Sequence, residues 1–201
     1  RATPPAKPML TGPDNGLFNE LYTFNAITTE PDGEDVYYYF DWGDGTNSGW
    51  LGPYPQATQT TAQKKWNSAG TYTVRVKARD INYAVGDWSD PLNITIKAPL
   101  LTLGDITARI GRISCDIKNI GDANATNIVW TMSLDGKLIV LGKKTTDTIT
   151  ILQPGANEPI KSTLIFGFGK TNIIISATCD EGVTVEVTKP AFVLGPFILQ
   201  V

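Results

Sequence analysis

Turn-forming residues divide this chain into short stretches in which apolar and polar residues alternate, and this pattern constrains the fold most strongly. In Thr71–Arg79, for example, Val74, Val76 and Ala78 share one parity, while threonine and basic residues take the other. Alternate side chains of a β-strand point to opposite faces, so one face of such a strand packs in a core and the other meets water. No stretch of the sequence holds an apolar stripe at helical spacing long enough for a core helix. The sequence therefore predicts an all-β protein.

The chain is long enough for two ordinary domains, because 201 residues can bury two separate cores. The first set of alternating strands ends before Pro99, which lacks the backbone donor that a strand ladder requires. A second set begins at Leu100 and continues through a hairpin signal at Asp135-Gly136. We predict two tandem immunoglobulin-like antiparallel β-sandwiches, residues 1–98 and 99–201.

Charge and histidine content exclude several functions. The net charge of −3 supplies no basic surface for nucleic acid or for anionic lipid. The chain has no histidine, which removes the usual general acid-base and nucleophile-activating groups and the commonest metal ligand. Catalysis by carboxylates alone is left as the only enzymatic alternative, so we expect no catalytic residues and no metal centre of the histidine type.

Export is the expected route of this chain. It begins at Arg1 with neither an initiator methionine nor an apolar leader, as expected for a mature extracellular protein whose signal has been removed. No stretch approaches the roughly 20 apolar residues that a membrane-spanning helix needs.

A family resemblance rests on two motifs in the first half. Residues 38–46, Tyr-Tyr-Phe-Asp-Trp-Gly-Asp-Gly-Thr, and residues 66–74, Trp-Asn-Ser-Ala-Gly-Thr-Tyr-Thr-Val, resemble the signature of the polycystic-kidney-disease (PKD) domain. This domain is an immunoglobulin-like sandwich of archaeal and bacterial surface proteins, and the likeness covers residues 5–98. Residues 100–201 resemble the cell-adhesion-related domains that follow such modules, through Ile117–Ala123, Asn127–Trp130, Leu152–Gly155 and Phe166–Thr171.

These resemblances imply a non-enzymatic structural or adhesive protein of a prokaryotic, in particular archaeal, cell surface. It would associate with itself or with other surface proteins or glycans, as a subunit of a filament or layer. Assembly of such a subunit by strand addition is suggested by the C-terminal segment described below. The alternative is a carbohydrate-binding accessory module of a secreted hydrolase. Neither family brings catalytic residues.

Acidic and aromatic residues supply candidate sites. The family turn motif consists of Asp41, Trp42, Gly43, Asp44 and Gly45, whose aspartates are expected to cap backbone donors while the glycines take positive φ. Asp32, Glu34 and Asp35 could bind calcium, although a solvated loop is the simpler interpretation. A second group is aromatic and is predicted on outward positions, as a sugar platform, an interface or mere cover for the sandwich: Tyr37, Tyr39, Trp50, Tyr54 and Trp88.

Modification sites are predicted in both halves. Asn93 and Asn124 each begin an Asn-X-Thr sequon and are candidate glycosylation sites. Cys115 and Cys179 share the inward parity of their strands, so we predict a disulfide between them, with two buried free thiols as the alternative.

The C-terminal segment from Ala191 carries no charged side chain and must be buried in some way. It is either the last strand of its own domain or a strand that inserts into a neighbouring subunit. The residues of this candidate assembly strand are Phe192, Val193, Leu194, Phe197, Ile198, Leu199 and Val201.

Overall fold

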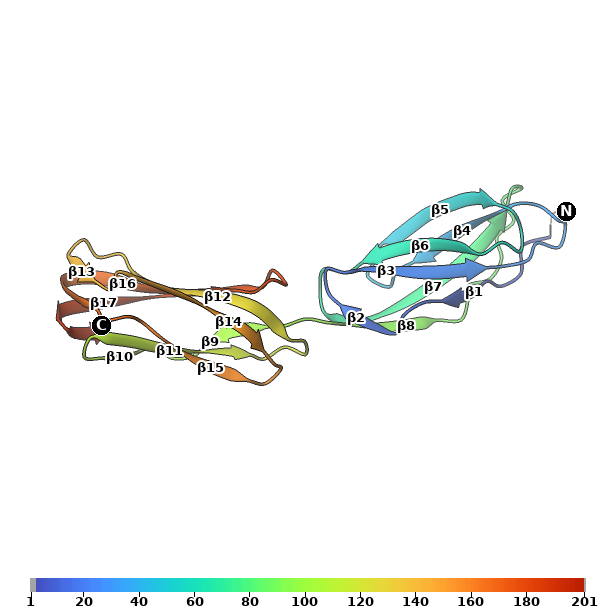
Figure 1. The fold of residues 1–201 in the computed structure, drawn as a ribbon. Coiled ribbons are helices and arrows are strands. Elements are labelled where there is room, and N and C mark those ends of the chain that lie inside the picture. The colour runs from blue at the N-terminus through green and yellow to red at the C-terminus, as the bar shows by residue number, and fades with distance from the viewer. Residues whose placement is uncertain (1–2, 201) are drawn as a thin grey trace. The chain divides into compact units, whose positions relative to one another are not determined.

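The computed structural model describes residues 3–200, and the chain divides into two compact units, Arg1–Lys97 and Ala98–Val201. We call these the N-terminal unit and the C-terminal unit. Each is a sandwich of two sheets whose strands pair antiparallel, except for β2 and β8 of the N-terminal unit, which pair in parallel, and the described residues contain no α-helix (Figure 1). Within residues 3–200 no helix is therefore available that could cross a membrane. The predicted all-β, immunoglobulin-like fold is confirmed.

The N-terminal unit packs a three-stranded sheet against a five-stranded one. The first sheet has the order β1 (Met9–Thr11), β3 (Leu21–Ile27), β6 (Thr60–Lys65). The second has the order β2 (Asn15–Leu17), β8 (Leu92–Lys97), β7 (Gly70–Asp80), β4 (Val36–Asp41), β5 (Asn47–Tyr54). The core between them is rich in aromatic rings, and its largest fully buried side chains are Phe24, Tyr38, Phe40, Trp66, Ile94 and Ile96.

The C-terminal unit is built in the same way from ten strands. One sheet joins β10 (Thr107–Arg109), β11 (Arg112–Asn119) and β15 (Asn157–Lys161), with β9 (Leu101–Leu103) also on β11. The other joins β14 (Lys144–Leu152), β12 (Ala125–Leu134), β16 (Phe166–Thr178), β17 (Thr184–Gly195) and β18 (Phe197–Gln200), with β13 (Ile139–Leu141) on β16. Its core is mainly aliphatic, with Ile113, Ile117, Ile128, Met132, Leu134 and Ile165 among the most buried residues.

Strand register defines the two ends of the N-terminal unit. β7 starts at Gly70 opposite Ile96 and finishes at Asp80 opposite Val36. The end near Asp80 is therefore opposite to the end at which the unit leaves through Lys97. We call it the loop end, formed by residues 28–35 and 80–86.

The C-terminal unit likewise has an end remote from its entry at Ala98. The Ile120 amide donates to the Leu100 carbonyl, so the loop after β11 lies at the entry side. The opposite end gathers the β10–β11 turn, the residues around β13, the start of β16 and the β17–β18 turn, since the Gly111 amide donates to the Pro196 carbonyl and Ile139 pairs with Gly167. We call it the tip, formed by residues 109–112, 135–144, 161–170 and 190–200.

The candidate assembly strand is paired within its own domain. Phe192 and its neighbours continue β17 along β16, and the chain then reverses so that Phe197 lies opposite Leu194. Gly195 supports this reversal with a φ of 61°. Val193 and Ile198 are buried, whereas Leu194, Phe197 and Leu199 are exposed. In the structure of the single chain, the segment thus forms the last strands of its own domain, which is the first of the two predicted alternatives. Val201 lies outside the described residues.

Candidate functional sites

The family turn between β4 and β5 is stabilised by its own aspartates. Asp41 Oδ1 accepts a hydrogen bond of 3.0 Å from the Gly43 amide, and Asp44 Oδ1 accepts one of 3.0 Å from the Thr46 amide. Asp44 Oδ2 lies 2.6 Å from Lys64 Nζ on β6. Burial opposes ionisation of Asp44, but the hydrogen bonds from Lys64 and Thr46 outweigh it and lower the pKa of this carboxyl. This arrangement is that of a structural turn.

The two glycines of the turn both have positive φ, +75° for Gly43 and +83° for Gly45, but their surroundings differ. A Cβ on Gly43 would lie 2.6 Å from both the backbone N and the backbone O of Thr73 on β7, whereas a Cβ on Gly45 would meet nothing within 4 Å. Trp42, the residue before Gly43, is buried, and its ring stacks on that of Phe40 at a centroid distance of 5.3 Å. The turn therefore closes the sandwich.

Aromatic and basic side chains alternate over the outer face of the β4–β5–β7 sheet. Tyr39 lies 5.3 Å from Trp50 and 6.1 Å from Trp88, measured between ring centroids. Lys77 Nζ sits over all three rings, at 4.6 Å from the centroid of Trp88. Such cation–π contacts hold the amine against the ring faces. We call these residues, together with Tyr37 and Arg79, the aromatic face.

The structure changes the predicted membership of this face in two respects. Tyr54 packs toward the core, 6.2 Å from Tyr38, because an extra residue on β5 opposite β4 reverses the parity after Trp50. Tyr83 was not predicted, yet its ring lies 4.5 Å from the Arg79 guanidinium carbon. Lys77 and Arg79 alternate with the inward residues Val76 and Ala78. This alternation is the sequence signal that could have placed both basic side chains on the aromatic face.

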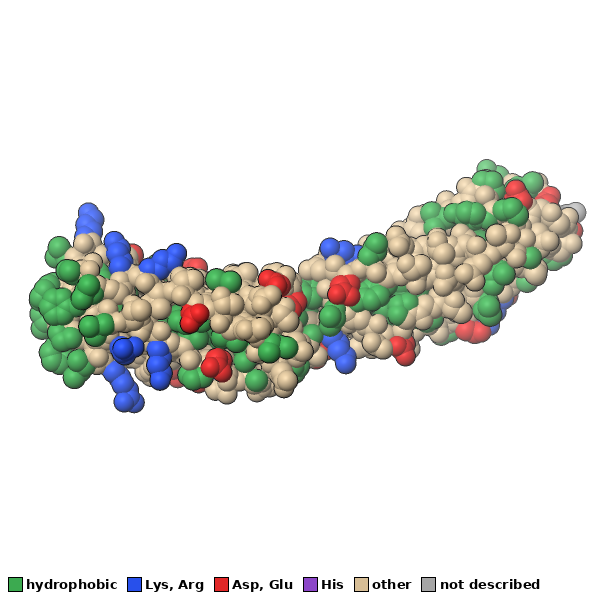
Figure 2. Space-filling model, viewed as in Figure 1, with side chains coloured by type: hydrophobic (Ala, Val, Ile, Leu, Met, Phe, Trp, Pro, Cys, Tyr) green, Lys and Arg blue, Asp and Glu red, His purple; other side chains and the backbone are tan. Residues whose placement is uncertain are grey.

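The tip of the C-terminal unit exposes large apolar side chains. Phe166 and Phe168 contact each other edge to face at 5.6 Å, and Phe168 pairs across the ladder with Leu194. Exposed fractions are 46% for Phe168 and 53% for Leu194. Figure 2 shows hydrophobic side chains gathered at this end of the unit. The exposed apolar set comprises Ile110, Leu138, Val140, Leu141, Leu164, Phe166, Phe168, Leu194, Phe197 and Leu199.

Basic residues surround this apolar set. The segments that form the tip contain a single acidic residue, Asp135, whose carboxylate accepts hydrogen bonds from Asn172. Within residues 3–200, ion pairs form only between Lys7 and Asp90 and between Lys64 and Asp44, so the basic residues of the tip have no carboxylate partner. These basic residues are Arg109, Arg112, Lys137, Lys143, Lys144, Lys161 and Lys170.

The loop end of the N-terminal unit has the opposite charge. Its segments, 28–35 and 80–86, contain no lysine or arginine, and they carry Glu30, Asp32, Glu34, Asp35 and Asp80. Three apolar residues of the same loops are exposed: Ile81, Val85 and Tyr83, the last at 71%. Of the five carboxylates, Asp32 and Asp35 are exposed and Glu34 is half-buried, whereas Glu30 and Asp80 are buried. The exposed charges of these two loops are therefore acidic and lie beside exposed apolar residues, although Arg79 of β7 packs over the Tyr83 ring.

The two cysteines are buried free thiols, so the predicted disulfide is wrong. Parity correctly indicated that both side chains point inward, but it does not give their positions along the strands. Cys115 Sγ donates to the Gly104 carbonyl at 3.3 Å, and Cys179 Sγ donates to the Val183 carbonyl at 3.6 Å. Burial raises the pKa of both thiols, which keeps them protonated and unreactive at neutral pH.

Both sequon asparagines are exposed. Asn93 lies on β8, where its side-chain oxygen accepts a hydrogen bond of 2.8 Å from the Thr73 hydroxyl. Asn124 lies in the loop before β12. Glycosylation at either position stays a prediction.

Comparison with known proteins identifies relatives of the N-terminal unit. The profile of the PKD domain matches residues 15–88. The PKD domain of an M14-like peptidase from Thermoplasmatales archaeon SCGC AB-540-F20 is 38% identical, over 48% of this chain and 98% of that chain, with a TM-score of 0.46.

Two further solved structures align with nearly the whole chain at low identity. They are red sea bream transglutaminase (12% identity, 96% of this chain and 32% of that chain, TM-score 0.37) and a marsupial T cell receptor (10% identity, 95% and 72%, TM-score 0.34). No curated protein matches the sequence.

Proposed function

Because the chain belongs to the PKD domain family through its N-terminal unit, we propose that it is a non-enzymatic structural and adhesive protein of a prokaryotic cell surface. PKD domains are extracellular immunoglobulin-like modules without catalytic residues, often adhesive or accessory. In the proposed assembly, the tip of one copy docks on the loop end of the next. The likeness of the C-terminal unit to cell-adhesion-related domains is part of the proposal.

The exposed apolar tip is the observation that carries this proposal. Monomeric proteins rarely leave many large apolar side chains exposed side by side, and such patches mark interaction surfaces. Fully burying one side chain of this size contributes about 1.5–3 kcal/mol, so even partial burial of Phe168, Leu194 and their neighbours would support a stable contact.

Charge complementarity indicates that the tip binds the loop end of another copy. The basic rim of the tip matches the acidic loop end, and the apolar centre of the tip matches Ile81, Tyr83 and Val85. Opposite potentials steer association and disfavour contact of like surfaces, so tip-to-tip pairing is the weaker arrangement. A contact between two different surfaces of one chain is heterologous and, unless it closes into a ring, builds an open filament.

Strand insertion is not the form of assembly that we propose. Phe192 to Gln200 is already paired with β16 or within the β17–β18 hairpin, and its removal would expose the core around Val193 and Ile198. Docking of the tip on the loop end of the next copy uses the exposed residues of the same segment without breaking this pairing.

Carbohydrate binding by the aromatic face is the weaker alternative. Sugars stack on open ring faces, but Lys77 and Arg79 already lie over the rings of Tyr39, Trp50 and Trp88 or of Tyr37 and Tyr83. A sugar would have to displace these cations. The geometry therefore favours a self-contained sheet surface over a sugar platform.

Sedimentation velocity over a concentration series, together with negative-stain micrographs, tests the proposed assembly. The natural chain is expected to form species larger than the monomer, and the double variant Phe168→Ser, Leu194→Ser to remain monomeric. The matched control is Val129→Ser, Ile151→Ser, which removes two residues of similar exposure from the sheet surface outside the tip. Assembly should be retained in the control. A natural chain that stays monomeric at every concentration would refute the proposal.

A further inference from the structure

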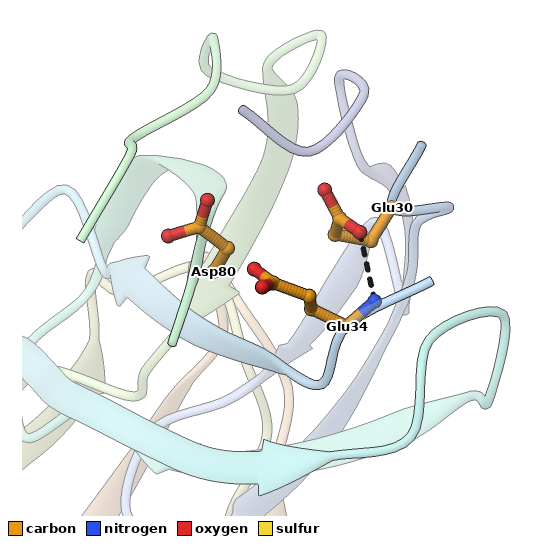
Figure 3. A group of neighbouring side chains, drawn as sticks. All are labelled: Glu30, Glu34 and Asp80. Carbon is orange, nitrogen blue, oxygen red and sulfur yellow. Dashed lines mark hydrogen bonds between the residues drawn. The ribbon is translucent and has the colours of Figure 1, made fainter. Parts of the chain in front are cut away.

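Three carboxylates from separate segments converge at the loop end. Glu30 follows β3, Glu34 precedes β4, and Asp80 ends β7. One carboxylate oxygen from each residue lies within 4.8 Å of those from the other two. Figure 3 shows the three side chains lying near one another, each from a different segment. The chain thus brings three negative groups together from positions up to fifty residues apart.

Two of these carboxylates are buried with an oxygen that lacks a partner. Glu30 is 4% exposed and Asp80 is 0% exposed. Among the described residues, Glu30 Oε1 and Asp80 Oδ2 have no hydrogen-bond donor. Burying an ionised carboxylate without compensation is costly, and the large majority of buried side-chain polar atoms have a hydrogen-bond partner. A cation bound between them would compensate both free oxygens.

The second oxygens of the same side chains are fixed by hydrogen bonds. Glu30 Oε2 accepts from the Glu34 amide at 2.8 Å, and Asp80 Oδ1 accepts from the Ala84 amide at 2.8 Å. Both oxygens of Glu34 accept from Asn82 Nδ2 at 2.8 Å. These bonds hold the carboxylates in place, so the free oxygens are oriented before any ligand arrives.

Among residues 3–200, no basic side chain forms an ion pair with this cluster. Neither ion pair of the described chain involves Glu30, Glu34 or Asp80. The nearest basic residue in sequence, Arg79, points to the other face of β7, where it contacts Tyr37, Trp50 and Tyr83. Within the part of the chain that the structure describes, the three carboxylates therefore have no basic side-chain partner.

We propose that Glu30, Glu34 and Asp80 bind a calcium ion. All three donors are hard oxygen ligands, with no histidine or cysteine beside them, which favours calcium over zinc. Calcium–oxygen distances of about 2.3–2.6 Å place two ligands up to about 5 Å apart, which accommodates the 4.8 Å spread. Magnesium, with shorter distances of about 2.0–2.1 Å and a strict octahedral geometry, fits an all-protein cluster of carboxylates less well.

The site differs from the calcium ligands predicted from the sequence. Glu34 is shared, but Asp32 is exposed and accepts a hydrogen bond from the Thr3 amide, and Asp35 is exposed. The ion would instead link the end of β3, the start of β4 and the end of β7, three segments that surround the aromatic core. Calcium would therefore stabilise the N-terminal unit and order its loop end, and this inference stands independently of head-to-tail assembly.

Calcium titration of the full chain tests the site directly. Calorimetric titration with CaCl2 should show binding of one ion per chain. In thermal unfolding, a free calcium concentration one hundred times Kd should raise the unfolding midpoint of the N-terminal unit by at least about 10 °C relative to EDTA. MgCl2 at the same concentration should give a smaller shift. No binding heat and an unchanged midpoint up to about 10 mM calcium would overturn the proposal.

Matched variants locate the ion. Asp80→Asn keeps the oxygen that accepts from Ala84 and removes the charge, so it should lower calcium affinity at least about tenfold and abolish the midpoint shift. Asp32→Asn, Asp35→Asn should respond to calcium as the natural chain does. If Asp80→Asn does not fold, Glu34→Gln at the half-buried position replaces it with the same expected loss. Calcium binding that is unchanged in these cluster variants would overturn the assignment. Introducing Phe168→Ser, Leu194→Ser into every sample keeps it monomeric, so this result does not depend on assembly.

Discussion

Alanine at Gly43 should destabilise the N-terminal unit far more than alanine at Gly45, although both glycines lie in the same turn. Each has a positive φ, and a left-handed conformation costs a residue with a Cβ about 1–2 kcal/mol. At Gly45 nothing lies within 4 Å of the new Cβ, so this is the whole expected loss. At Gly43 the new Cβ would lie 2.6 Å from the backbone N and O of Thr73.

That contact cannot be relieved by a side-chain rotation, because both clashing atoms belong to the backbone of β7. The turn must move away from β7, close to the pair formed by Asp41 and Arg75. Overpacking of this kind costs about 1–3 kcal/mol, so the expected total for Gly43→Ala is about 2–5 kcal/mol. Denaturant titration followed by circular dichroism measures both variants against the natural chain. Equal losses, within about 0.5 kcal/mol, would refute the packing argument.

Three further predictions concern the core, the thiols and pH. Trp42→Ala should cost about 3–5 kcal/mol and abolish the calorimetric transition of the N-terminal unit while that of the C-terminal unit persists; a loss below about 1 kcal/mol would mean that Trp42 is on the surface. Without reductant, a thiol reagent at pH 8 should find no reactive cysteine in the folded chain and two in the unfolded chain, and fewer than two would reveal a disulfide. Because the pKa of Asp44 is lowered on folding, its ionised form contributes stability above the unfolded value of 3.8, which is lost as the pH falls through the lowered pKa. The melting temperature should therefore fall more steeply below about pH 4 in the natural chain than in Asp44→Asn, and parallel profiles would contradict this.

Strand parity made the fold predictable because burial decides which face of a strand is apolar. Tyr38, Phe40 and Trp42 are buried as their alternation indicated, and so are Val74 and Val76. Parity alone did not locate the extra residue on β5 that turns Tyr54 inward. The available sequence signal was Gly52-Pro53, because a glycine and a proline inside a strand mark an irregular ladder.

The candidate sites were harder to predict because they join residues that are distant in sequence. Asp80 continues the inward parity of Val76 and Ala78, and an aspartate at such a position was the available signal of a buried carboxylate. Its neighbours Glu30 and Glu34 could not be assigned to it without the pairing of β4 with β7. The tip is likewise assembled from four separate segments, so only the fold reveals it.

Complementation between two blocked variants tests head-to-tail assembly most directly. One variant carries Phe168→Ser and Leu194→Ser at the tip; the other carries Asp32→Lys and Tyr83→Lys at the loop end, where both residues are exposed. Sedimentation velocity should find each variant monomeric alone, and an equimolar mixture should form a dimer and nothing larger, through the one intact tip and the one intact loop end. A loop-end variant that still assembles alone, or a mixture that stays monomeric while the natural chain assembles, would contradict the account.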